Sequence, residues 1–188
     1  MRPARLPLLS AHEYLDGELR SELRHEYVAG QVFAIAGAGR RHGEIVVNLG
    51  SALHRAARGG ACRVYVADMK VRIDAADIFY YPDILVGCDP ADDHEYYSRA
   101  PCLLVEVLSD STERADRGEK WQNYRLLPSL REYLLVDSRR IAVEVYRLGD
   151  GGWTCEPLNP EEAFDSTCLG CSVPLQEIYA GLRFDDRA

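Results

Sequence analysis

Pro101-Cys-Leu-Leu-Val-Glu-Val-Leu-Ser-Asp-Ser-Thr-Glu-Arg-Ala-Asp-Arg-Gly-Glu-Lys-Trp-Gln-Asn-Tyr124 predicts a strand, a tight turn and a helix in direct succession. Residues 101–108 form a short apolar run, which is typical of a strand buried on both faces. Glu106 lies within this run. Because an unpaired charge is costly to bury, we expect either a cationic side chain or a metal ion beside Glu106.

The predicted helix carries a polar face with a spacing of four residues. Ser109 to Thr112 supply turn residues and an N-cap, and acidic side chains follow in the first helical turn. Asp116, Lys120 and Tyr124 then recur every four residues and share one face. We expect this face to pack back toward the end of the strand that carries Glu106.

Lysine is rare in this chain. Of its 22 basic residues, only Lys70 and Lys120 are lysines, and the others are arginines. A lysine is needed where a site requires a compact ammonium whose pKa can be shifted, because guanidinium always stays charged. Chance alone explains the two lysines equally well, so composition leaves both interpretations open.

Length and composition predict one globular domain. The chain has 188 residues, of which 47% are hydrophobic and 28% are charged, so residues 1–188 suit a single domain with a substantial core. The net charge of -8 argues against non-specific coating of nucleic acid but leaves room for a local basic groove. No apolar run approaches the roughly 20 residues of a membrane span, so we expect no membrane contact and a cytoplasmic location.

The six cysteines predict no disulfide framework. In a reducing compartment we expect them to act as small buried hydrophobic side chains. Cys168 and Cys171 alone have the spacing of metal ligands, but no second pair with matching spacing follows, so zinc is the minor alternative.

Periodicity places the other elements in order along the chain. Ser10 and Glu13 form a capping box at the start of a helix over residues 11–15. Residues 27–28 and 31–36 predict a hairpin that turns at Ala29-Gly30. Further predicted elements are a helix over residues 42–57, one strand over residues 63–73 with Asp68 and Lys70 as a solvated pair, a strand over residues 84–86, and strands over residues 132–136 and 141–147. Together these elements predict an α/β (α+β) fold with one mixed sheet flanked by helices.

Two further polar residues stand at the ends of predicted elements. Asp83 follows Pro82 directly before the apolar residues 84–86, so it lies at the mouth of a second buried strand. His42 lies in the first turn of its helix, on the apolar stripe. It can face a bound anion at the helix N-terminus, or it can be a hydrogen-bonded residue at the edge of the core.

Asp83 and Glu106, followed by a helix with Lys120, form a set that suits phosphodiester hydrolysis. Carboxylate oxygens are hard ligands that bind Mg²⁺ or Mn²⁺. Such an ion offsets the charge that builds on a phosphate and activates a water molecule. A nearby lysine can orient that water and stabilise the transition state.

The ordered series of motifs resembles the Uma-type restriction endonuclease family within the PD-(D/E)XK nuclease superfamily. The resemblance extends from about Ser10 to Leu182, and its strength comes from the order of the motifs. The matching residues are Arg24-His-Glu26-Tyr-Val-Ala-Gly30, His42, Tyr81-Pro82-Asp83, Glu106-Val-Leu-Ser109, Ser111-Thr112, Asp116, Glu119-Lys120, Tyr124 and Glu132-Tyr-Leu-Leu-Val-Asp137.

This resemblance implies a restriction-endonuclease-like fold, with a central mixed sheet flanked by helices and an N-terminal helix and hairpin. It also implies that Asp83, Glu106 and the backbone carbonyl of Val107 are metal ligands. The superfamily motif has a lysine two residues after the glutamate, where this chain has Leu108. In the resembled family this role moves to the lysine of the following helix, here Lys120.

Three more residues receive roles through the same resemblance. Glu26 becomes an outer carboxylate that ligates a second metal ion or orients water. His42 becomes a residue that holds phosphate or donates a proton to the leaving oxygen. Asp116 becomes a partner that fixes Lys120 or Arg117, with a surface ion pair as the alternative.

Three functions follow, from three classes. The first is a Mg²⁺- or Mn²⁺-dependent endonuclease that cleaves DNA, with Asp83, Glu106, Lys120, Glu26 and His42 in its active site. The second is an inactive protein of nuclease fold that binds nucleic acid or a protein partner. The third is a purely structural ion pair of Glu106 and Lys120, with or without Arg114. A homodimer is compatible with the first function, because cutting both strands of a duplex usually needs two sites.

Overall fold

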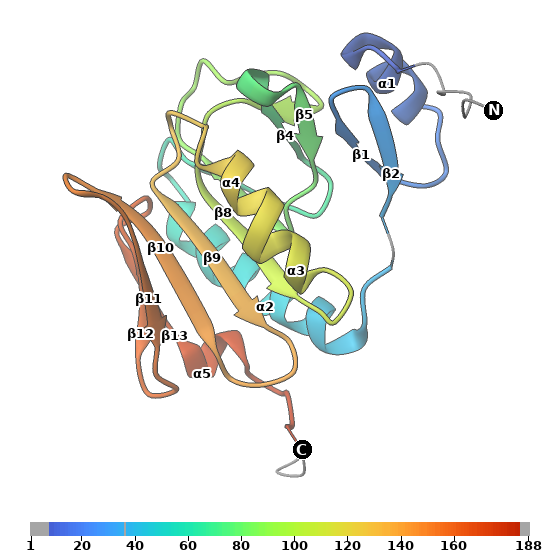
Figure 1. The fold of residues 1–188 in the computed structure, drawn as a ribbon. Helices are drawn as coiled ribbons and strands as arrows, with labels where there is room; N and C mark the ends of the chain where they lie inside the picture. Colours follow the sequence, from blue (N-terminus) through green and yellow to red (C-terminus); the bar gives the residue numbers. More distant parts are fainter. Residues whose placement is uncertain (1–7, 36, 185–188) are drawn as a thin grey trace.

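A six-stranded mixed sheet lies at the centre of the structure (Figure 1). The computed structural model describes residues 8–35 and 37–184. Strand β8 (Pro101–Leu108) is parallel to β9 (Glu132–Asp137) and antiparallel to β6 (Ile84–Gly87). The sheet runs in the order β11 (Gly152–Leu158), β10 (Val143–Gly149), β9, β8, β6 and β3 (Arg63–Val66). The strand that carries Glu106 is therefore interior to the sheet, as its apolar sequence predicts.

Helices cover both faces of this sheet. Alternate residues of β8 point to opposite faces, so Leu103, Val105 and Val107 pack with α2 (Arg40–Ala57) in one core cluster. Leu104 and Leu108 pack in a second cluster. That cluster includes Trp121 and Tyr124 of α4 (Trp121–Tyr124), which follows α3 (Glu113–Ala115) and η2 (Asp116–Lys120, a π-helical turn) after β8 (Figure 1). Within the described residues, no helix has the combination of length and apolar character that crossing a membrane requires.

A second, five-stranded sheet carries the N-terminal hairpin against the Glu106 face. It runs in the order β2 (Gln31–Ala34), β1 (His25–Val28), β5 (Ile78–Tyr80), β4 (Lys70–Ile73) and β7 (Tyr97–Ser98). The expected turn is confirmed, since Ala29 and Gly30 both have positive φ, of 46° and 91°. The predicted end of the second strand, Ala36, lies outside the described residues. Other elements are α1 (Ala11–Glu18), η1 (Asp74–Ala76), the hairpin of β12 (Ala163–Ser166) and β13 (Cys171–Pro174), and α5 (Leu175–Ile178).

The mixed α/β class is confirmed, but one predicted strand and the prediction of a single sheet are wrong. The single strand predicted over residues 63–73 is wrong, because the chain turns at Ala67, which has a φ of 61°. The first half becomes β3 and pairs with β6, and the second half becomes β4 and pairs with β5. The strands of the described residues are consequently distributed over three sheets instead of one.

The predicted solvated pair of Asp68 and Lys70 is also wrong. Lys70 is only 5% exposed, and its Nζ atom donates to the Tyr81 hydroxyl at 3.2 Å. The ammonium also lies 5.0 Å from the centre of the Tyr81 ring. Burial disfavours its charge and lowers the pKa of Lys70 below the ordinary value. Asp68 pairs with Arg24 instead.

Replacing Lys70 by methionine should change how stability depends on pH. The free energy of unfolding of the wild type should rise relative to that of Lys70→Met as the pH increases from the lowered pKa of folded Lys70 to the ordinary value of 10.5. Over this window the unfolded chain holds a proton that the folded chain has lost, so stability grows by up to about 1.4 kcal/mol per pH unit. Urea unfolding of both proteins between neutral pH and about pH 10.5 measures the difference. A difference that stays constant would contradict this account of the buried ammonium.

The cysteines correct another expectation. The structure joins Cys62 to Cys88 and Cys102 to Cys168 as disulfides, whereas the sequence predicts unpaired hydrophobic side chains. Cys171 is a half-buried free thiol. Cys168 therefore pairs with Cys102, 66 positions away in the sequence, and not with its near neighbour Cys171.

Candidate active site

Lys120 occupies the centre of a group of carboxylates. Its Nζ atom lies 3.0 Å from Glu26 Oε1, 3.1 Å from Glu106 Oε1 and 3.3 Å from Asp116 Oδ1. The side chains of Glu106 and Asp116 are only 4% and 2% exposed. Three acids from β1, β8 and η2 thus share one ammonium, and the predicted return of the helix onto the Glu106 strand is confirmed.

The helix after β8 presents the face that its four-residue spacing predicts. The Tyr124 hydroxyl donates to Glu106 Oε1 at 2.6 Å, so it reaches the same oxygen as Lys120. Asp116 and Lys120 lie at the two ends of the π-helical turn η2, a rare conformation that is frequent at functional sites. The centre of the Tyr80 ring lies 5.5 Å from the Lys120 ammonium. These contacts hold the ammonium in place against β8.

Asp83 is held beside Glu106 by the backbone of β8. Its Oδ2 atom accepts a hydrogen bond of 2.7 Å from the Val107 N–H and lies 3.1 Å from His42 Nε2. His42 comes from the first turn of α2, on the opposite side of the sheet from Lys120. Among the described residues, the hydrogen bonds to the Asp83 carboxylate all reach Oδ2. The Oδ1 atom is open to another partner.

The six residues predicted as catalytic or metal-binding line one pocket. Glu26, His42, Asp83, Glu106, Val107 and Lys120 surround a space of about 90 Å³, together with Asp116 and Tyr81. A water molecule takes about 30 Å³ in the liquid, so the space suits an ion with a few waters rather than a large organic ligand. The hydroxyl-bearing residues Ser109, Ser111 and Thr112 form the rim.

The electrostatics of the pocket follow from burial and from crowded acids. Burial opposes the charge on Lys120, but Glu106, Glu26 and Asp116 outweigh it and hold the pKa of Lys120 well above its usual range. Burial, together with the neighbouring Asp116 and Asp83, raises the pKa of Glu106 although Lys120 opposes this shift. One ammonium cannot neutralise all of these acids, so the set has excess negative charge that a further cation would offset.

Three alternatives left open by the sequence are decided by burial. Asp116 is 1% exposed and faces Lys120, so the surface ion pair is wrong. Arg117 pairs with Glu113 and Glu144 instead. Arg114 is exposed and does not belong to the buried group. Leu108, at the position of the superfamily lysine, is 1% exposed in the core, so Lys120 alone supplies the ammonium.

Two residues that contact Glu106 or Lys120 were not among the site residues predicted from the sequence. Tyr124 shares the spacing of Asp116 and Lys120, and this spacing was the signal that could have assigned it to Glu106. Tyr80 belongs to the five-stranded sheet, and no local pattern in the sequence indicates its contact with Lys120.

Residues 11–176 match the Uma2 family, whose description is "Putative restriction endonuclease". The chain belongs to this family. Among its relatives, the Synechocystis sp. protein slr1290 is 37% identical over 96% of both chains, and sll1609 of the same organism is 32% identical over 83% of this chain and 90% of its own. Both carry the name "uncharacterized protein".

A solved structure shares the fold of this Uma2 chain. It is described as a "putative nuclease belonging to DUF820" from Anabaena variabilis. The two superpose with a TM-score of 0.73, covering 91% of this chain and 97% of the other, at 16% identity. At this identity the likeness concerns the architecture, a mixed α/β fold with helices flanking a mixed sheet.

Proposed function

We propose that this Uma2 chain is a metal-dependent endonuclease that hydrolyses phosphodiester bonds of DNA. The observation that carries the proposal is the meeting of Lys120 with Glu106 and Glu26 in the pocket that Asp83 also lines. A structural ion pair needs one acid for one ammonium. Here the acids outnumber the ammonium and face a space that an ion with its waters can enter.

The donor set fits a hard divalent cation such as Mg²⁺ or Mn²⁺. Asp83, Glu106 and the Val107 carbonyl offer oxygen atoms, which these ions prefer. Asp116 Oδ1 supports the fit, because it is buried and makes no well-aligned hydrogen bond within the described residues, although Lys120 lies 3.3 Å away. The bound ion would offset the charge on a scissile phosphate and lower the pKa of a water molecule.

The side chains of this chain have distinct roles in the proposed reaction. Lys120, fixed by Glu26 and Asp116, orients the attacking water and stabilises the developing negative charge. His42, hydrogen bonded to Asp83, is positioned to hold the phosphate or to protonate the leaving oxygen. The hydroxyls of Ser109 and Ser111 at the rim can donate to phosphate oxygens.

The names of the family and of the Anabaena structure support DNA as the substrate class. The net charge of -8 means that attraction to phosphate must come from the site and its ion instead of from the whole surface. A homodimer would place two such sites on the two strands of a duplex.

Asp83→Asn should lower the affinity for Mn²⁺ by about a hundredfold or more and abolish cleavage, because the amide cannot supply the ligand charge. Calorimetric titration of Mn²⁺ into both proteins measures binding, circular dichroism checks folding, and gel assays of duplex and single-stranded DNA measure cleavage. Asp150→Asn, at an exposed turn, is the matched control. A folded wild type without Mn²⁺ binding, free or with DNA, would contradict the proposal. Binding without cleavage would favour an inactive nuclease fold.

A further inference from the structure

Four cysteines from four separate segments meet at the end of the central sheet opposite the pocket. Cys62 directly precedes β3, Cys88 follows β6, Cys102 lies near the start of β8, and Cys168 lies in the β12–β13 turn. Because Cys102 and Glu106 are four residues apart on one strand, the cluster is about 13 Å from the acids. It is distinct from the proposed active site.

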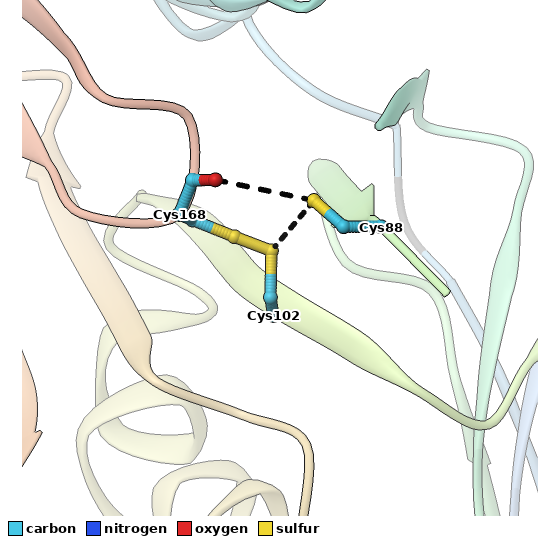
Figure 2. A group of neighbouring side chains, drawn as sticks. All are labelled: Cys88, Cys102 and Cys168. Atoms are coloured by element: carbon cyan, nitrogen blue, oxygen red, sulfur yellow. Dashed lines mark hydrogen bonds between the residues drawn. A yellow bond between two sulfur atoms is a disulfide. The ribbon is translucent and has the colours of Figure 1, made fainter. Parts of the chain in front are cut away.

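The sulfur atoms of two disulfides are in mutual contact. Cys62 is joined to Cys88 and Cys102 to Cys168, yet Cys88 Sγ lies only 3.5 Å from Cys102 Sγ. The Sγ atoms of Cys88, Cys102 and Cys168 all lie within 4.8 Å of one another. Figure 2 shows how these three side chains point toward one another. Two disulfides that only crosslink the chain have no need to touch. Three sulfurs this close together, with the Cys62 sulfur bonded to one of them, are the ligand type of a four-cysteine metal site.

We infer that, when both disulfides are reduced, Cys62, Cys88, Cys102 and Cys168 bind one Zn²⁺ ion as a structural site. Structural zinc takes four thiolates in a tetrahedron with Zn–S bonds of about 2.3 Å, which places the sulfurs about 3.8 Å apart. The 3.5 Å between Cys88 and Cys102 is close to this separation. Cys62, which is bonded to Cys88 in the oxidised protein, supplies the fourth thiolate after reduction.

A buried carboxylate, Glu132, holds in place Cys168, the proposed ligand that is most distant in the sequence. Glu132, fully buried on β9, accepts hydrogen bonds from Ser166 Oγ at 2.9 Å, from Thr167 N at 3.1 Å and from Cys168 N at 3.2 Å. This carboxylate fixes the turn that brings Cys168 to β8. The four cysteines are partly buried and pack against the core cluster on the α2 face, which supplies the apolar shell typical of a structural metal site.

The change from two disulfides to a zinc site requires reduction of the disulfides and then loss of the thiol protons. Each disulfide takes two electrons and two protons from a dithiol reductant, which is itself oxidised to a cyclic disulfide. The four thiols that result lose four protons as Zn²⁺ binds their thiolates. The site therefore alternates between two disulfides and one bound ion. In either state it links the start of β3 to the end of β6 and the β12–β13 hairpin to β8.

Cobalt spectroscopy tests the inference directly. The protein is reduced with a phosphine, which takes oxygen from water and leaves no competing thiol, and is freed of metal with a chelator. Titration with Co²⁺ should then produce thiolate charge-transfer and tetrahedral d–d bands that saturate at about one ion per chain and vanish when Zn²⁺ is added. Protein left oxidised should give no such bands.

Variants separate this site from other metal binding. Cys102→Ser and Cys168→Ser should lower the affinity at least about tenfold and shift the charge-transfer band. Cys155→Ser and Cys171→Ser, which remove thiols outside the cluster, should leave both unchanged. Asp83→Asn should also keep the bands, which distinguishes this site from the proposed nuclease centre. If a serine variant fails to fold, the spectrum of the wild type still decides, and reduced, folded wild type without thiolate bands would overturn the inference.

Discussion

Lys120→Met is expected to lower the free energy of unfolding by about 3–5 kcal/mol in metal-free buffer at neutral pH, the cost of removing one partner from a buried ion pair. The Lys120 ammonium lies within 3.3 Å of Glu26, Glu106 and Asp116. Without it these carboxylates face one another, and some must take up protons to remain buried. The loss should therefore shrink as the pH falls, because protonated acids no longer need the ammonium.

Urea unfolding in the presence of a chelator measures this loss, and Lys70→Met is the matched control. Lys70 is the other lysine of the chain and is also buried, but its hydrogen-bond partner is the Tyr81 hydroxyl instead of a carboxylate. Its replacement should cost much less at neutral pH. Equal effects of the two substitutions would show that Lys120 acts through packing and not through its charge.

The same variant separates binding from catalysis. Mn²⁺ should restore part of the stability of Lys120→Met, because the ion supplies the positive charge that the carboxylates have lost. Cleavage should remain at least about a hundredfold below the wild type, since methionine cannot orient water or stabilise an oxyanion. Restored stability together with wild-type cleavage would remove Lys120 from the proposed mechanism.

The sequence predicted those parts of the site that depend on local periodicity. The apolar run around Glu106 was sufficient to identify a buried strand, and the spacing of Asp116, Lys120 and Tyr124 was sufficient to predict a shared face. The turn at Ala29-Gly30 was predicted because these two residues separate two apolar runs, and glycine adopts positive φ readily. In each case the cause lies within a few residues of the effect.

Features that depend on distant partners could not be predicted in this way. The alternation of residues 63–73 passes through Ala67 without a sign of the turn, and only pairing with β6 and β5 divides the two halves. Cys168 reaches Cys102 because the β12–β13 turn returns to β8, although the two are 66 positions apart in the sequence. The burial of Lys70 likewise requires Tyr81 from another segment.

Glu106→Gln should abolish cleavage and weaken Mn²⁺ binding by about a hundredfold or more while leaving the chain folded. The amide keeps the shape of the side chain, and its oxygen can still accept the hydrogen bond from the Tyr124 hydroxyl. It also removes a charge that burial disfavours, so the stability at neutral pH should change by no more than about 1 kcal/mol. Glu161→Gln makes the same chemical change on an exposed side chain and should alter neither binding nor cleavage.

The raised pKa of Glu106 adds a second measurement to this variant. Burial and the neighbouring acids raise this pKa, and at a pH below it the metal-free wild type carries a proton on Glu106 that a bound cation must displace. Mn²⁺ affinity should therefore fall as the pH decreases through the raised pKa, because the protonated carboxyl competes with the ion. Calorimetry in buffers of different ionisation enthalpy should detect proton release in the wild type and a smaller release in Glu106→Gln. Equal proton release in both proteins would mean that the proton leaves another group, and that Glu106 is not the acid that exchanges its proton for the metal ion.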